Sequence, residues 1–490
     1  MDTRLSDLRT RLAEVEDLQH ALRLLQFDQQ TAMPAAGAEA RTESLATLAR
    51  ILHERQTAPE LFGLLDALAG SDDPLVRVAR RDADKARRVP GELVSEATRA
   101  AADGQRAWER AREEDDFAAF LPHLRRNIDL AHEYAACFAD EIDEPYDALL
   151  DDYEPGMRTA DVRTVFGPLR EELPGLIAEA AESESHPPPE LVGPFPADGQ
   201  RRAIRAILER VGFDESSWRL AESAHPFCAT IGAGDNRLTT RYPEDVLESP
   251  LSSLHEFGHG LYEAQIDPAY ARTPLHHGAS LTIHESQSRL WEVFVAGREP
   301  FWRGAWELLH PHLDGRLDGH DPRSFVAAIG AVRPTLIRVD ADPVSYPLHI
   351  VLRFDLELAL LSGDLAPRDL PAAWRDGMRA LLGIEVPDDR HGALQDVHWA
   401  AGAFGYFPTY ALGTMLAAQL WETATGEIPD LDARIEAGDL APLREWLRDR
   451  IHRHGRSLEP RELIRGATGR ELDAAPYLAF ARARAHAPAA

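Results

Sequence analysis

The segment that decides how this chain is interpreted runs from residue 249 to residue 260 and reads SPLSSLHEFGHG. A serine followed by a proline is a common helix start, with Ser249 as the N-cap and the proline as the first helical residue. Residues four apart lie on one face of a helix, so His255 and His259 can direct ring nitrogens at one metal ion. The segment therefore predicts a helix with two metal ligands and an adjacent carboxylate, Glu256.

The adjacent carboxylate indicates hydrolytic chemistry. A cation such as Zn2+ lowers the pKa of a water molecule that it binds to about 7, and a neighbouring carboxylate can accept the proton as the water attacks a carbonyl group. This arrangement favours a metal-dependent peptidase with Glu256 as the general base. The same five-residue pattern also arises by chance, with both histidines as ordinary surface or core residues. A third ligand is therefore needed, because a catalytic zinc usually has three protein ligands.

The next segment with helical spacing, 280-SLTIHESQSRLWE-292, offers two candidates for the third ligand. Ser280 can cap this helix, and the apolar positions mark the side that faces the core. Glu285 and Glu292 share the other side. Either can bind the metal or form an ordinary ion pair with Arg289, and the spacing alone leaves both open.

Other ligand sets fit the sequence less well. Metzincin-type metalloproteases carry a glycine three residues and a histidine six residues after the second histidine, but positions 262 and 265 are tyrosine and glutamine. That subclass is excluded. His276 and His277 remain as competing ligands in a predicted loop, where histidines are commonly solvated.

The composition excludes several kinds of partner. Acidic residues outnumber basic ones by 82 to 53 in the 490-residue chain, and the formal charge of -29 disfavours nucleic acid and anionic lipid. No apolar run is long enough to span a membrane, and the charged N-terminal segment lacks the apolar centre of a secretion signal. Cys137 and Cys228 are isolated and predict no disulfide framework. We therefore expect a cytoplasmic protein without nucleic-acid or membrane partners.

Helical spacing dominates the first 185 or so residues and predicts long antiparallel helices. Breaks are expected at Pro34, Pro90 and Pro155. The proline cluster HPPPELVGPFP at 186–196 is the best boundary candidate. The segment 224–245 combines β-branched residues with glycines, which predicts short strands, and helical spacing resumes after it. The chain is therefore expected to be mainly α-helical.

Further blocks resemble the thermostable carboxypeptidase Taq family, the M32 metallocarboxypeptidases. In chain order they are 225-HPF-227, 235-DNRLT-239, 255-HEFGH-259, 284-HESQ-287, 337-IRVDAD-342 and 392-GALQDVHW-399. The segments 146-YDALLDDYEPGM-157 and 403-AFGYFPTYALG-413 are also similar to the family. The chain departs from the family pattern at 27-FDQQ-30 and at 341–349, where prolines replace the expected Glu and Asn. Spaced blocks in the same order make this resemblance specific, and it extends over almost the whole chain.

The resemblance implies a helical gluzincin-type metallopeptidase with a deep central groove and a small β-sheet near the active site. Glu285, rather than Glu292, is then the third ligand. The family also implies one catalytic unit over residues 1–490, with a helical part at about 1–190 and a metal-binding part at about 191–490. One divalent ion per chain is expected, with Zn2+ as the first choice and Co2+ as the alternative.

The same resemblance implies a homodimer that releases single amino acids from peptide C-termini with broad specificity. Two other functions are weighed against it. One is an oligopeptidase that cuts internally, and the other is a binding protein that keeps the groove without catalysis. The intact set of His255, Glu256, His259 and Glu285 argues against the binding protein.

A carboxypeptidase must recognise a free carboxylate, and arginine suits this task because its planar fork can bind both oxygens. Arg353, on a predicted helix that the resemblance places near the groove, is the first choice, with Arg237 and Arg338 as alternatives. Arg353 can equally form an ion pair with Glu357 four residues on. His225 and Arg237 are placed in the groove by the resemblance alone.

Hydrogen-bond donors beside the metal are needed to stabilise a tetrahedral intermediate. His398, Tyr406 and Tyr410 are available, and Tyr410 is preferred to Tyr406. Asp396 can orient a metal-binding histidine through its second ring nitrogen, or it can hold His398 or a helix end.

Overall fold

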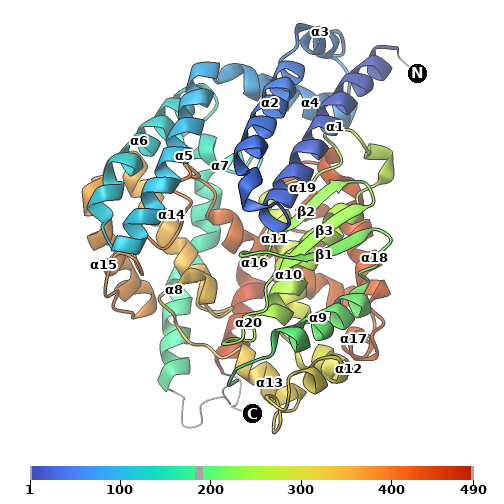
Figure 1. The fold of residues 1–490 in the computed structure, drawn as a ribbon, viewed down its shortest axis with the longest axis vertical. Helices are drawn as coiled ribbons and strands as arrows, with labels where there is room; N and C mark the ends of the chain where they lie inside the picture. Colours follow the sequence, from blue (N-terminus) through green and yellow to red (C-terminus); the bar gives the residue numbers. More distant parts are fainter. Residues whose placement is uncertain (1–2, 183–190, 487–490) are drawn as a thin grey trace.

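The protein is largely helical, as its spacing predicts (Figure 1). The fold is given by a computed structural model, which describes residues 3–182 and 191–486. The helices of the first part are α1 (Thr3–Thr31), α2 (Ala38–Gln56), α3 (Pro59–Ala67), α4 (Pro74–Arg88), α5 (Gly91–Glu114), α6 (Phe117–Ala136), α7 (Pro145–Leu150), α8 (Thr159–Glu182) and α9 (Ala197–Val211). Pro34, Pro90 and Pro155 all fall between helices, so the predicted breaks are confirmed.

The second part is also helical and carries the metal-binding motif. Its helices are α10 (Ser249–Ala264), α11 (Leu281–Arg289), α12 (Glu299–Leu309), α13 (Pro322–Ile329), α14 (Tyr346–Ser362), α15 (Leu370–Leu382), α16 (Pro408–Glu427), α17 (Leu431–Ala437), α18 (Ala441–Arg450), α19 (Pro460–Thr468) and α20 (Ala475–Ala485). A π-helical turn, η3 (Leu290–Val295), continues α11 without a break. Such turns are frequent at functional sites.

Three strands form one small mixed sheet beside α1 and α10 (Figure 1). They are β1 (Trp218–Glu222), β2 (Cys228–Gly232) and β3 (Asp235–Thr240), in the order β1-β3-β2. β1 runs parallel to β3, and β2 runs antiparallel to it. The strands predicted within 224–245 are confirmed as β2 and β3. β1 lies before that segment, and its sequence WRLAE has no β-branched residue that could signal a strand.

The helix with the metal-binding motif, α10, is held between the sheet and α11. Phe257 of α10 packs against Trp218 of β1, with ring centroids 5.5 Å apart, and against Trp291 of η3, with centroids 5.1 Å apart. On its other side, α11 packs against α16. α11 is therefore enclosed by helices on two sides, which fixes the direction of its side chains.

The main hydrophobic core extends from Ala111 to Ala485 and includes residues on both sides of the proline cluster. A smaller core joins α1, α3 and α4 around Leu12, Leu65 and Leu75. Residues 186–190 of the proline cluster lie outside the described residues. The main core does not end at the proline cluster, so it offers no support for a domain boundary there. A single catalytic unit over residues 1–490 stays a prediction. No described helix has the length and apolar character needed to cross a bilayer.

The two predicted helix caps have different outcomes. Ser280 caps α11 as predicted, because its hydroxyl accepts a hydrogen bond from the N–H of Ile283 at 3.2 Å. The prediction for Ser249 is wrong. α10 begins at Ser249 itself, after Glu248, and the Ser249 hydroxyl donates to the side chain of Gln200 on α9 at 2.7 Å. A buried hydrogen bond to another helix takes the place of the local cap.

Candidate metal centre

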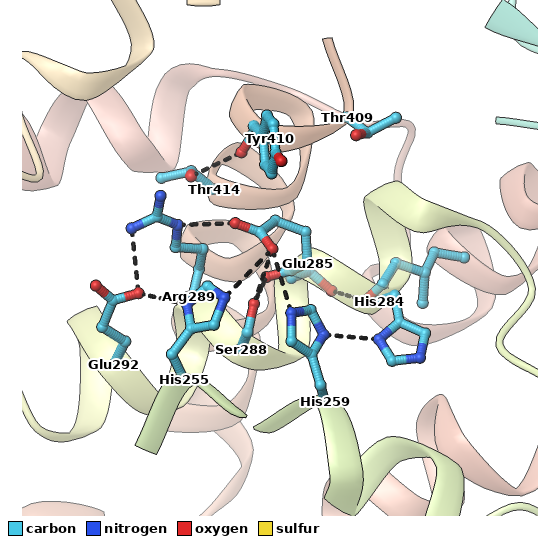
Figure 2. Close-up of polar contacts among 12 residues, drawn as sticks. His255, His259, His284, Glu285, Ser288, Arg289, Glu292, Thr409, Tyr410 and Thr414 are labelled. Atoms are coloured by element: carbon cyan, nitrogen blue, oxygen red, sulfur yellow. Dashed lines mark hydrogen bonds and ion pairs between the residues drawn. The ribbon is translucent and has the colours of Figure 1, made fainter. Parts of the chain in front are cut away.

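His255 and His259 of α10 meet Glu285 of α11 in one cluster (Figure 2). Glu285 Oε2 lies 3.7 Å from His255 Nε2 and 3.5 Å from His259 Nε2. Two atoms that bind a tetrahedral ion at about 2.1 Å each are separated by roughly 3.4 Å, so these distances fit a zinc-type cation. Within residues 3–182 and 191–486, this is the one group of three or more His, Cys, Asp or Glu side chains with ligand atoms so close together.

Each histidine of the cluster is oriented through its other ring nitrogen. His255 Nδ1 lies 2.7 Å from Glu292 Oε2. His259 Nδ1 lies 2.7 Å from His284 Nδ1, and His284 Nε2 lies 3.0 Å from Glu263 Oε1. When both Nε2 atoms face a cation, the Nδ1 atoms carry the protons. His255 then donates to Glu292, while His259 donates to His284 and His284 donates to Glu263.

These orienting partners were missed in the sequence, although signals for them exist. Glu292 is weighed there only as a ligand or a solvated charge. His284 directly precedes Glu285 in the HESQ block, and Glu263 follows His259 by four residues on α10, the spacing that places two side chains on one helix face. What the sequence lacks is the distance between α10 and α11, which decides whether these side chains meet.

Two glycines let neighbouring helices approach α11 closely. A Cβ atom on Gly258 of α10 would overlap with the backbone oxygen of Gln287, and one on Gly413 of α16 would lie 2.6 Å from Glu285 Cβ. Glycine in a helix interior costs about 1 kcal/mol relative to alanine. The close approach of α10 and α16 to α11 is the physical reason for glycine at both positions.

We expect the substitution Gly413→Ala to weaken metal binding by at least about tenfold, because the added methyl group must displace Glu285. Gly426 lies on the same helix, and a Cβ atom there would meet nothing within 4 Å. Gly426→Ala is therefore the matched control, and helix propensity should stabilise it by up to about 1 kcal/mol. Competition with a chromophoric chelator measures the affinities. Equal affinities in the two variants would contradict the packing argument.

The charges of the site suit a divalent cation. Two carboxylates, Glu285 and Glu292, pair with the single positive charge of Arg289, so one negative charge is left over. Ionised Glu256 adds a second negative charge. Burial disfavours the charged form of His255, but Glu285 and Glu292 outweigh burial and raise its pKa to about 9. A cation that binds His255 therefore replaces a proton.

Glu256 is available as a base beside the cluster. It follows His255 on α10, is only 8% exposed, and its carboxylate accepts no hydrogen bond from any part of the chain that the structure describes. Burial raises the pKa of Glu256 to about 7. A buried carboxylate with this proton affinity can both accept and release a proton near neutral pH.

Arg353, the first choice for the substrate carboxylate, is fully buried on α14. Its guanidinium donates to Asp396 Oδ2 at 2.7 Å, to Gln395 Oε1 at 2.7 Å and to the backbone oxygen of His349 at 2.8 Å. The alternative ion pair with Glu357 is not formed, because Glu357 accepts hydrogen bonds from other side chains. With no exposed surface, Arg353 is not placed for direct contact with a substrate, contrary to our expectation.

Asp396 joins two arginines and does not orient a metal ligand. Arg338 donates to Asp396 Oδ1 at 2.9 Å, while Arg353 holds Oδ2. His398 Nδ1 lies 3.9 Å from Asp396 Oδ1, too far for a hydrogen bond, and this nitrogen has no hydrogen-bond partner among the described residues, so Asp396 does not hold His398 either. Two arginines and one aspartate leave a net positive charge in the interior, which favours an anionic partner. Arg338 is 7% exposed, and its guanidinium carbon lies 5.0 Å from the ring centroid of Tyr410.

The three predicted hydrogen-bond donors form one cluster on the α16 side of Glu285. His398 Nε2 lies 3.3 Å from the Tyr410 hydroxyl, and the rings of Tyr406 and Tyr410 are 5.2 Å apart. Figure 2 shows Tyr410 on the opposite side of Glu285 from the two histidine ligands. Burial lowers the pKa of His398 to about 4, so this ring is neutral at pH 7.

The other two predicted groove residues lie near the sheet. Arg237 of β3 pairs with Asp235 at 2.8 Å and lies over the ring of Phe27, and His225 is exposed. A cavity of about 710 Å3 opens between α1 and β2. Its lining includes Phe27, Phe227, Thr230, Glu263, His277 and His284. The cavity therefore adjoins the metal centre through His284, and Arg237 contacts its wall.

His276 and His277 do not belong to the metal cluster. His277 Nε2 lies 2.8 Å from Glu16 Oε2 of α1, and the His277 ring also approaches Arg23. His276 is buried in the loop after α10. His277 connects this loop to α1, so a structural role replaces the competing ligand role.

Known proteins that are similar to this chain are metallopeptidases and carboxypeptidases. A family model described as carboxypeptidase Taq (M32) metallopeptidase matches residues 7–485. Thermostable carboxypeptidase 1 of Thermus thermophilus is 41% identical over 479 residues, and that of Pyrococcus furiosus is 38% identical over 476, covering 93% and 94% of each chain respectively. Solved structures are also similar. The crystal structure of an M32 carboxypeptidase from Deinococcus radiodurans R1 has a TM-score of 0.95 and is 36% identical in sequence. An apo-Mg structure of Pyrococcus furiosus carboxypeptidase has a TM-score of 0.96 and is 35% identical, and each match covers 99% of both chains.

Proposed function

Because the chain belongs to the carboxypeptidase Taq (M32) metallopeptidase family, we propose that it releases single C-terminal amino acids from peptides with broad specificity. One divalent cation is held by His255, His259 and Glu285. The observation that carries the proposal is the placement of these three ligand atoms within 4.8 Å of one another beside Glu256. Two imidazoles and a carboxylate suit Zn2+, and they suit Co2+ as well.

Proton transfer is the task of Glu256. When bound, the cation polarises the scissile carbonyl group and makes an attacking water molecule more acidic. Glu256 accepts the proton of this water on its carboxylate and passes it to the departing amine nitrogen. Its buried position beside His255 supports this role, because burial keeps the proton affinity of the carboxylate in the neutral range.

Stabilisation of the tetrahedral intermediate is the task of Tyr410. Its hydroxyl donates a hydrogen bond to the developing oxyanion. Neutral His398, 3.3 Å from that hydroxyl, orients it, and Tyr406 packs against the Tyr410 ring. The position of Tyr410 beside Glu285 supports this assignment (Figure 2).

The substrate carboxylate is bound by Arg338, with Arg353 in a supporting role. Arg338 keeps some exposure and lies against the Tyr410 ring, whereas Arg353 is fully enclosed. Both share Asp396, so the pair retains one positive charge for the carboxylate. His225 and Arg237 contribute to the groove near the sheet, where the upstream part of a peptide lies.

A peptide and its C-terminal amide test this function. We expect release of the last residue from the free acid and little from the amide. Arg338→Gln should raise KM for the free acid by about 10- to 100-fold, because one charge-assisted hydrogen bond contributes about 1.5–3 kcal/mol. Analysis of released amino acids measures both effects.

Arg298→Gln is the matched control for this experiment, since Arg298 also pairs with an aspartate, Asp432, but at the surface. Its KM should equal that of the unmodified protein. Internal cleavage of the amide at the same rate as the free acid would favour the oligopeptidase instead.

We also propose a homodimer, which the family resemblance implies, and a cytoplasmic location, which the two isolated cysteines favour. Sedimentation velocity tests the dimer: a single species of monomer mass at micromolar concentration would contradict it. The location is tested by fractionation of cells that produce the protein.

A further inference from the structure

Arg289 lies between the ligand Glu285 and the second glutamate, Glu292 (Figure 2). Its Nε donates to Glu285 Oε1 at 3.0 Å, and its Nη1 donates to Glu292 Oε2 at 3.1 Å. The guanidinium carbon lies 4.2 Å from the ring centroid of Tyr346, and the side chain is 12% exposed. Two carboxylates and one aromatic face thus fix this guanidinium in a single orientation.

The two oxygens of Glu285 have different partners because of Arg289. Oε1 accepts the hydrogen bond from Arg289. Oε2 accepts one from the Ser288 hydroxyl at 3.1 Å and is the atom that lies 3.7 Å and 3.5 Å from the Nε2 atoms of His255 and His259. The carboxylate therefore presents one oxygen to a cation and keeps the other engaged by the guanidinium.

Arg289 reaches a second ligand indirectly. Glu292 Oε2 receives Nη1 of Arg289 and also lies 2.7 Å from His255 Nδ1. Glu285, Arg289 and Glu292 are separated by four and three residues, which places all three on one face of the continuous helix formed by α11 and η3. A single guanidinium is thus linked to two of the three metal ligands.

We infer that Arg289 is a positioning residue that keeps Glu285 a one-oxygen ligand and so preserves an open position at the metal. A catalytic zinc site has three protein ligands and one open position for water, and the second oxygen of Glu285 would add a fifth ligand that crowds this position. Arg289 also prevents Glu292 from becoming a ligand, because Glu292 Oε2 is shared between Arg289 and His255. The inference rests on the metal centre of the proposed function.

A positive charge alone offers a different explanation for Arg289. The charge of lysine is the same, but its single nitrogen cannot reach two carboxylates in the fixed geometry of the guanidinium fork. Arg289→Lys therefore separates the fork from the charge, and Arg289→Gln removes both. Arg456→Lys is the control, because Arg456 also uses two nitrogens to bind carboxylate oxygens, here both on Asp82 at 2.7 Å and 2.8 Å and outside the metal cluster.

The Co2+-substituted protein reports the number of ligands directly. Five-coordinate Co2+ absorbs visible light more weakly than four-coordinate Co2+. We expect the visible bands of both Arg289 variants to weaken and kcat on a peptide substrate to fall by about 10- to 100-fold. The Arg456→Lys variant should keep the spectrum and kcat of the unmodified protein.

Each outcome bears on the inference. An unchanged spectrum and kcat in Arg289→Gln overturn it. A changed spectrum in Arg289→Gln together with an unchanged one in Arg289→Lys overturns the bridging role, since charge then suffices. If the unmodified protein binds no Co2+, the proposed metal centre itself fails. Circular dichroism establishes that each variant is folded, and Arg289→Lys decides the question should Arg289→Gln not fold.

Discussion

Replacing Glu256 by glutamine is expected to lower kcat by a factor of about 10²–10⁴ while the metal stays bound. The amide has nearly the size of the carboxylate but cannot accept the proton of the attacking water. KM should change little, because the proposed binding of the substrate carboxylate depends on Arg338 and not on Glu256. Stopped-time analysis of released amino acids gives kcat, and elemental analysis gives the metal content.

Glu248→Gln is the control for this substitution. Glu248 directly precedes α10 and pairs with Arg241, so it tests the loss of a carboxylate near the same helix without removing the base. We expect its kcat to equal that of the unmodified protein. Glu256→Gln with unchanged kcat and full metal content would show that another group accepts the proton.

Local signals account for the parts of the site that the sequence predicts correctly. The spacing of His255 and His259 requires only that one helix forms, and α10 does form over Ser249–Ala264. The cap at Ser280 is also local, because a hydroxyl reaches a backbone N–H three residues on. The third proposed ligand, Glu285, lies on a separate helix, α11. The sequence alone left Glu285 and Glu292 open, and the resemblance to the family chose Glu285.

Contacts between distant segments are the parts that the sequence did not predict. Ser249 binds Gln200, 49 residues away, and so gives up the cap that its position suggests. Asp396 binds Arg338 and Arg353, 58 and 43 residues away. Helical spacing cannot show such pairs, because it says which residues share a face but not which face meets another helix.

The same limit of helical spacing explains why we now assign the substrate carboxylate to Arg338 and not to Arg353. Arg353 lies on a helix, as expected, but the packing of α14 encloses it completely. Arg338 lies in a short turn, a place where sequence periodicity gives no direction for a side chain. Burial and partner therefore distinguish the two arginines, and both are properties of the tertiary fold.

Substitution of Glu285, the proposed third ligand, should have the largest effect on the amount of bound metal. We expect Glu285→Gln to reduce the bound metal from one ion per chain to a small fraction, because a neutral amide is a poor ligand and the charge balance of the site is lost. Activity should fall with the metal content. Glu292→Gln should keep the metal, with activity reduced by about 10- to 100-fold, because it loses only the charge of the group that orients His255.

Elemental analysis after dialysis against trace Zn2+, and separately against trace Co2+, distinguishes the two glutamates. A chelator should inactivate the unmodified protein, and either ion should restore its activity. The reason is that three side chains, His255, His259 and Glu285, hold the ion reversibly. Glu285 Oε2 faces both histidine Nε2 atoms, whereas Glu292 Oε2 faces His255 Nδ1, on the other edge of the ring. A carboxylate on that edge can orient the imidazole but cannot share its cation. Equal loss of metal from the two variants would therefore contradict the division of roles between ligand and orienting group.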